Sequence, residues 1–144
     1  MSKIVCIYSE KDYAVDFLSP LCNYICDELS AIRVSYDKDS DDDTITEIYD
    51  AVTDANIVFF LGHGRSDALY ADLIDDCVLF DKENVNQLKG KRLFLLACNS
   101  ADFIKKYGLE SHIEHEKIEK QNYIYHLAGL INWVLFLPFA FWLF

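Results

Sequence analysis

The sequence is poor in basic residues. Lysine and arginine together number 13, against 24 aspartate and glutamate residues, and the formal net charge is -11. Binding to the phosphates of a nucleic acid requires clustered lysine and arginine side chains. We therefore expect no nucleic-acid partner.

A secretory signal is also missing, because the apolar run in the opening residues, MSKIVCIY, is too short for one. The cysteines are odd in number: Cys6, Cys22, Cys26, Cys77 and Cys98. Both observations predict a protein kept in a reducing environment, the cytoplasm.

Metal-binding patterns are weak. Cys22 and Cys26 are four residues apart and would share one helix face, but a pair of cysteines without further ligands is a weak zinc signal. Cys6 lies in an apolar run. We therefore predict that these thiols are small buried side chains and that the protein has no metal ion and no cofactor. A Gly-rich phosphate-binding fingerprint is likewise absent from the sequence.

The sequence contains enough hydrophobic residues for one sizeable core, since 52% of its 144 residues are hydrophobic and 15% are aromatic. Continuous apolar runs predict strands at 3–8, 32–36, 56–62 and 91–98. Helices are expected at 12–29, 44–55, 82–88 and 100–107, and a long loop with short extended pieces at 65–83. Strands that alternate with helices predict an α/β fold, a three-layer αβα sandwich around a mostly parallel sheet of at least four strands.

Local signals predict where the helices begin. Pro20 either restarts the first helix, with Ser19 as its cap, or kinks it. Thr44 and Glu47 have the spacing of a capping box at the start of the second helix. The run DKDSDDD at 37–43 is expected to be a solvated acidic loop.

The end of the sequence differs in kind. Residues 122–144 contain no Asp, Glu, Lys or Arg, and about 20 such residues in a helix can cross a bilayer. Two buried strands or a core helix are the alternatives. We therefore predict a domain at 1–110, a charged linker at 111–121 and an apolar C-terminal helix at 122–144, a candidate transmembrane segment.

Two apolar runs end on residues suited to catalysis. His63 follows the third predicted strand in FFLGHGRSDALYA (59–71), and Cys98 ends the fourth in LFLLACNSADF (93–103). Ligands bind beyond the carboxyl ends of strands in parallel α/β sheets. If these strands are neighbours, a thiol nucleophile and its base meet at one edge. Gly64 lets the backbone approach a ligand, so the N–H groups of Gly64 and Cys98 are expected to form an oxyanion hole.

An apolar block that ends in His-Gly, followed by another that ends in Ala-Cys, resembles the caspase-like fold of cysteine peptidases. This group includes caspases, metacaspases, clostripain, gingipain and bacterial CHAT domains, and LGHGRS and LLACNSA are most similar to the CHAT branch. The resemblance spans 3–108 and implies that His63 is the catalytic base and Cys98 the nucleophile. The family usually continues with two more strands, so the chain resembles a C-terminally truncated or divergent member.

The expected function is hydrolysis of peptide bonds in a protein or peptide substrate through a Cys-His dyad. Two alternatives stay open. One is a catalytically inactive caspase-like module with an interaction or regulatory role, tethered to a membrane by 122–144. The other is an unrelated flavodoxin-like domain in which both motifs are structural. A homodimer is a further expected form.

Overall fold

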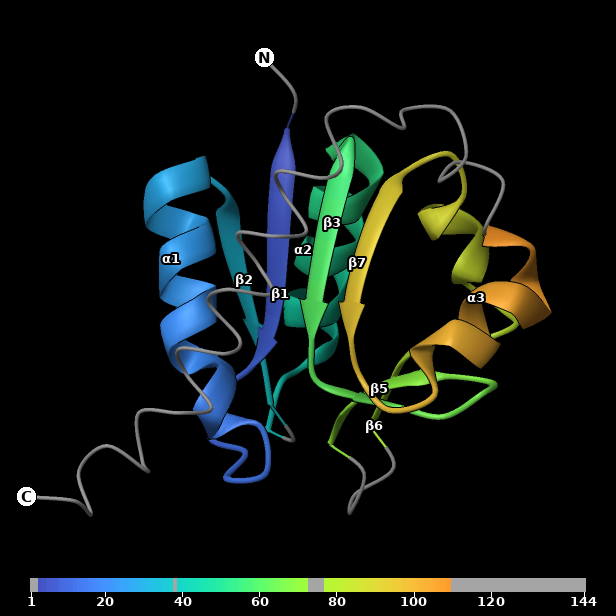
Figure 1. The fold of residues 1–144 in the computed structure, drawn as a ribbon, viewed down its shortest axis with the longest axis horizontal. Coiled ribbons are helices and arrows are strands. Elements are labelled where there is room, and N and C mark those ends of the chain that lie inside the picture. The colour runs from blue at the N-terminus through green and yellow to red at the C-terminus, as the bar shows by residue number, and fades with distance from the viewer. Residues whose placement is uncertain (1–2, 38, 73–76, 110–144) are drawn as a thin grey trace, which may run out of the picture. The chain divides into compact units, whose positions relative to one another are not determined.

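The computed structural model describes residues 3–37, 39–72 and 77–109 (Figure 1). The strands are β1 (Ile4–Ser9), β2 (Ile32–Tyr36), β3 (Ile57–Leu61), β4 (His63–Gly64), β5 (Leu69–Asp72), β6 (Cys77–Phe80) and β7 (Arg92–Leu96). The helices are α1 (Ser19–Leu29), α2 (Asp42–Asp54) and α3 (Ser100–Tyr107), with short 3-10 turns η1 (Asp16–Leu18) and η2 (Val85–Leu88). The protein is therefore a mixed α/β structure.

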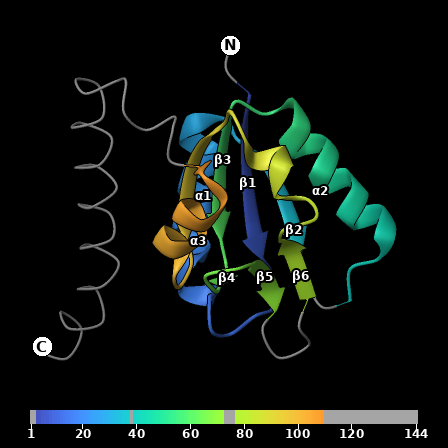
Figure 2. The same ribbon diagram turned by 90° about the vertical axis from the view of Figure 1, so that its right-hand side faces the viewer.

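The main sheet is parallel, and its strands run in the order β2-β1-β3-β7. This confirms the predicted parallel sheet of four strands. Helices α1 and α2 lie on opposite faces of the sheet (Figure 2). Alternate residues of β1 face opposite sides of the sheet. Val5 and Ile7 join a core cluster with Ile48 and Val52 of α2. On the other face, the Cys6 thiol donates a hydrogen bond to the sulfur of Cys22 in α1.

A second, antiparallel sheet has three strands in the order β4-β5-β6, and β5 and β6 lie in the segment 65–83, which was expected to be a long loop with short extended pieces. Its pairing shifts register between Leu69 and Tyr70 and again between Tyr70 and Asp72. Each shift breaks the alternation of inward and outward side chains, and this explains why no periodic pattern marks these strands in the sequence.

The helix starts differ in detail from the predicted ones. Helix α1 restarts after η1 with Pro20 in its first turn, as one alternative proposed, but Leu18 occupies the cap position, not Ser19. Helix α2 begins earlier than expected, because the Asp41 side chain accepts the Thr44 N–H at 2.9 Å and thereby caps the helix. The predicted Thr44 cap is therefore wrong, and the acidic run supplies the first turn, where negative charge is favourable.

The expected linker at 111–121 and apolar helix at 122–144 lie outside the described residues. Within the described ranges, no helix combines the length and the hydropathy needed to cross a bilayer.

Candidate active site

His63 and Cys98 lie at the same edge of the main sheet. Strands β3 and β7 are parallel neighbours whose last paired residues are Leu61 and Leu96. Each candidate residue lies two positions beyond its member of that pair. The Gly62 N–H donates to the Leu96 carbonyl at 3.2 Å and continues the pairing past the strand ends. The fold thus brings together the two motifs, which are far apart in the sequence.

Asp12 holds the His63 ring, and sequence reasoning did not identify it. His63 Nε2 lies 2.6 Å from Asp12 Oδ2, and the two side chains are only 15% and 16% exposed. Asp12 follows β1, which is the other neighbour of β3, so three parallel strands deliver residues to this edge. An acidic residue just after the first predicted strand was the signal available in the sequence.

The carboxylate of Asp12 is itself fixed. Its Oδ1 accepts the backbone N–H of Ala14 at 2.8 Å, and the Asp12 carbonyl accepts the N–H of Val15 at 3.1 Å. This tight turn leaves Oδ2 for the imidazole. An ionised carboxylate only accepts hydrogen bonds, so with Asp12 ionised and the ring neutral, the ring proton lies on Nε2 and Nδ1 is the nitrogen that can accept a proton.

Gly64 brings its backbone against that of Cys98. A Cβ at position 64 would lie 2.6 Å from the Cys98 carbonyl oxygen and 3.0 Å from Ala97 Cβ. Strand β4 pairs with β5, and the Arg65 N–H donates to Ala68 O at 2.8 Å. Hydrogen-bonded and non-hydrogen-bonded pairs alternate in an antiparallel ladder, so the Gly64 N–H is turned away from β5. The Gly64 N–H therefore does not pair with β5, and Gly64 itself is buried.

Cys98 lies in the turn between β7 and α3. Strand β7 is shorter than predicted and ends at Leu96, so Cys98 is an exposed turn residue and does not end the strand. The next residue, Asn99, has a left-handed backbone with φ of 54° and occupies the N-cap position of α3. Asparagine is one of the few residues that tolerate this conformation, and the sharp turn exposes the thiol. Within the described part of the chain, no hydrogen bond joins the thiol to the His63 ring.

Compared with protein-family models, with curated proteins and with solved structures, the chain matches none of them. The interpretation of this site therefore depends on the geometry and chemistry of its own residues.

The close approach at Gly64 makes a testable prediction. We expect Gly64→Ala to destabilise the protein by about 1–3 kcal/mol, because the new methyl group collides with backbone that cannot rotate away. Urea denaturation measures this loss. Gly90→Ala is the control: a Cβ there meets nothing within 4 Å, and only the left-handed backbone, with φ of 77°, opposes it. If Gly64→Ala is as stable as the wild type, the two backbones are not in contact.

Proposed function

We propose that this protein is a caspase-like cysteine peptidase that hydrolyses a protein or peptide substrate. One observation carries the proposal: the His63 ring, held by the largely buried Asp12 carboxylate, lies at the same sheet edge as the exposed thiol of Cys98. A rigid parallel sheet places both residues beyond its strand ends, where α/β proteins bind ligands. We also propose that the complete protein has the three-layer αβα architecture of the caspase-like group.

In the proposed reaction, Nδ1 of His63 takes the proton of the Cys98 thiol. The sulfur then attacks the carbonyl carbon of the scissile peptide bond. Backbone N–H groups of Gly64 and Cys98 stabilise the negative charge that develops on the carbonyl oxygen. The imidazolium returns its proton to the leaving amine, and the C–N bond breaks. Water, deprotonated by His63, then cleaves the thioester and restores the thiol.

Asp12 acts as a positioning residue in this scheme. It contacts the imidazole and fixes the ring's tautomer, and it stabilises the imidazolium that forms when Cys98 loses its proton. Because the same carboxylate accepts the Ala14 N–H, the ring is tied to a turn of the backbone and not to a freely moving side chain.

The test uses the purified full chain and a library of peptides that carry a thiol-directed acyloxymethyl ketone. We expect covalent labelling of Cys98, mapped by mass spectrometry, with a strong preference for particular peptides. Iodoacetamide serves as the reference reagent, since an exposed thiol reacts with it whether or not it is catalytic. Labelling by iodoacetamide alone would contradict the peptidase proposal.

A second prediction concerns Asp12. We expect Asp12→Asn to lower kcat for peptide hydrolysis by at least about 100-fold and to leave KM nearly unchanged. Asparagine can still accept the Ala14 N–H, so the turn is kept, but its amide N–H group favours the wrong tautomer of His63. Asp16→Asn is the matched control, because Asp16 is an exposed acid four residues away. Equal losses in both variants would indicate a general charge effect and not positioning of the ring.

One observation favours the second candidate function, a catalytically inactive interaction or regulatory module. His63 bonds to Asp12, and no hydrogen bond links it to the Cys98 thiol. Under this alternative the peptide probes do not react, whereas a binding partner still recognises the same sheet edge. For either function we propose a cytoplasmic protein, tethered to a membrane by the charge-free sequence 122–144, with a homodimer as a further form.

A further inference from the structure

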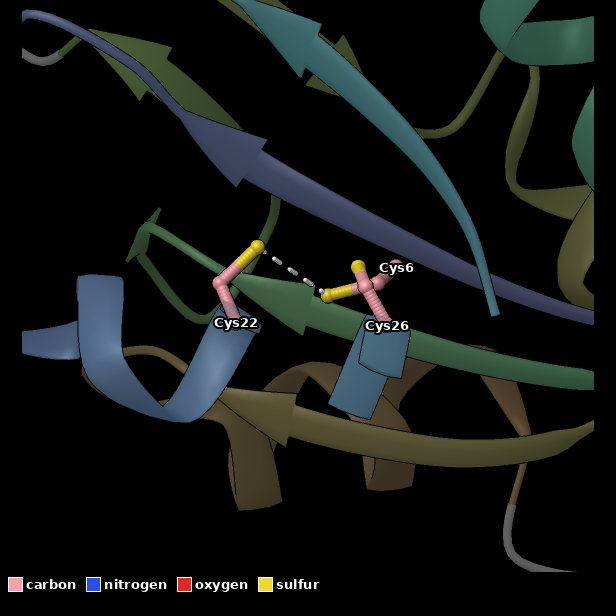
Figure 3. Close-up of side chains that lie close together, drawn as sticks. All are labelled: Cys6, Cys22 and Cys26. Carbon is pink, nitrogen blue, oxygen red and sulfur yellow. Dashed lines mark hydrogen bonds between the residues drawn. The ribbon is translucent and has the colours of Figure 1, made fainter. Parts of the chain in front are cut away.

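Three cysteines converge between the sheet and helix α1. Cys6 lies in the middle of β1, and Cys22 and Cys26 are one turn apart on the face of α1 that covers it (Figure 3). All three sulfur atoms lie within 4.8 Å of one another, and Cys6 Sγ is 3.7 Å from Cys22 Sγ. The sequence shows only the helical pair; the fold supplies the third thiol.

From this geometry we propose that Cys6, Cys22 and Cys26 form a binding site for a thiophilic divalent metal ion, with Zn²⁺ as the expected occupant. Zinc bound by thiolates has Zn–S distances of about 2.3 Å, which in a tetrahedron places sulfur atoms roughly 3.8 Å apart. The Cys6–Cys22 separation of 3.7 Å is close to this value, and Cys26 Sγ, which lies within 4.8 Å of both, would move closer on binding.

The charges around the cluster favour a divalent ion. Arg33 is paired in register with Cys6 across β1 and β2, and it is fixed by Glu10, by Asn23 and by the Tyr8 ring, 5.5 Å away. Three thiolates exceed the charge of Zn²⁺ by one negative charge; the Arg33 guanidinium is the neighbouring positive group, and it already forms an ion pair with Glu10. A monovalent ion such as Cu⁺ would leave a larger uncompensated charge in a buried site.

The hydrogen bond between Cys6 and Cys22 shifts the pKa of both thiols. The Cys6 thiol donates to Cys22 Sγ and so lowers the pKa of Cys22 to about 7; burial opposes this effect, and the positive charge of Arg33 adds to it. The same hydrogen bond, together with burial, raises the pKa of Cys6. Zn²⁺ binds cysteines as thiolates, so binding at this cluster would release the thiol protons.

Coordination is incomplete with three protein ligands. Among the residues that the structure describes, no fourth His, Cys, Asp or Glu joins the group. Cys6 and Cys22 are fully buried, whereas Cys26 is half-buried, which gives water a route to the fourth position. An open position of this kind distinguishes the site from closed structural zinc sites with four ligands.

The test uses the full chain without a histidine tag, stripped of metal and kept reduced. On addition of Co²⁺ we expect one equivalent to bind with an intense sulfur-to-cobalt charge-transfer band, and Zn²⁺ to displace it. Cys26→Ser should weaken Zn²⁺ affinity by more than about 100-fold. Mutation of a residue that only hydrogen-bonds to a metal ligand already weakens metal affinity by about 10- to 100-fold, and Cys26 is itself a proposed ligand. Cys77→Ser, outside the cluster, should retain the affinity of the wild type.

A second measurement needs no variant. Zn²⁺ should slow alkylation of the half-buried Cys26 and leave that of the exposed Cys98 unchanged. Absence of both the charge-transfer band and this protection would overturn the proposal. So would a Cys6–Cys22 disulfide on oxidation combined with no metal affinity after reduction, because the cluster would then be a redox pair. A larger affinity for Cu⁺ than for Zn²⁺ would overturn the assignment of the occupant.

Discussion

Under the proposed peptidase function, replacing Cys98 with alanine is expected to abolish peptide hydrolysis. Without the thiol, no acyl-enzyme can form, and loss of the nucleophile in peptidases of the serine type lowers kcat by roughly 10⁶-fold. Cys98 is exposed and lies in a turn, so its removal should leave the free energy of unfolding nearly unchanged. Hydrolysis of the best peptide from the probe library, measured fluorimetrically, checks the activity, and urea denaturation checks the fold.

The control for this result is Cys77→Ala, which removes a thiol from β6 and should retain activity. If the Cys98→Ala protein hydrolyses peptides at the rate of the wild type, the nucleophile is a different residue. If neither the wild type nor the variant hydrolyses any peptide, the interaction-module alternative is favoured.

Phe103→Ala is expected to cause the largest loss of stability, about 3–5 kcal/mol. Phe103 of α3 is fully buried in the main core cluster, and its ring meets that of Tyr107 at a centroid distance of 5.0 Å. Truncation leaves a cavity where α3 docks. Because small domains are stable by only about 5–15 kcal/mol, the variant should unfold at a much lower urea concentration.

Phe17→Ala provides the comparison, since Phe17 lies in η1 and is 56% exposed. The same chemical change there should cost well under about 1 kcal/mol, because little apolar surface leaves water when Phe17 folds into place. Similar losses in the two variants would mean that α3 does not dock through Phe103.

Much of the fold could be predicted because its strands are continuous apolar runs. Strands β1, β2, β3 and β7 all coincide with such runs, and their parallel pairing follows from the helices between them. Short extended pieces were expected at 65–83, but their pairing into a small sheet could not be predicted, because register shifts remove the periodicity. The start of α2 was misplaced because several acidic residues in succession can cap a helix, and only the fold selects Asp41.

The candidate site, too, could be predicted only in part. His63 and Cys98 each follow an apolar run, and strand order was needed only to make them neighbours. Asp12 and Cys6 could not be assigned to their sites, because their contacts join segments that no sequence motif links. Asp12 and His63 are 51 positions apart in the sequence. Cys6 of β1 joins Cys22 and Cys26, which lie in the following helix α1. Both contacts depend on the order of the strands in the sheet, which a single sequence does not reveal.

Strand β7 comes last in the sequence of the main sheet and also lies at one side of it. Strands β2, β1 and β3 are complete once the ribosome has added Leu61, whereas β7, which leads into Cys98, is made later and pairs with β3 alone in the described sheet. Edge strands held by one neighbour open more readily than central ones. We therefore expect amide protons of β7 to exchange with solvent faster than those of β1. If β7 exchanges faster, local opening at this edge separates His63 from Cys98 more often than global unfolding does.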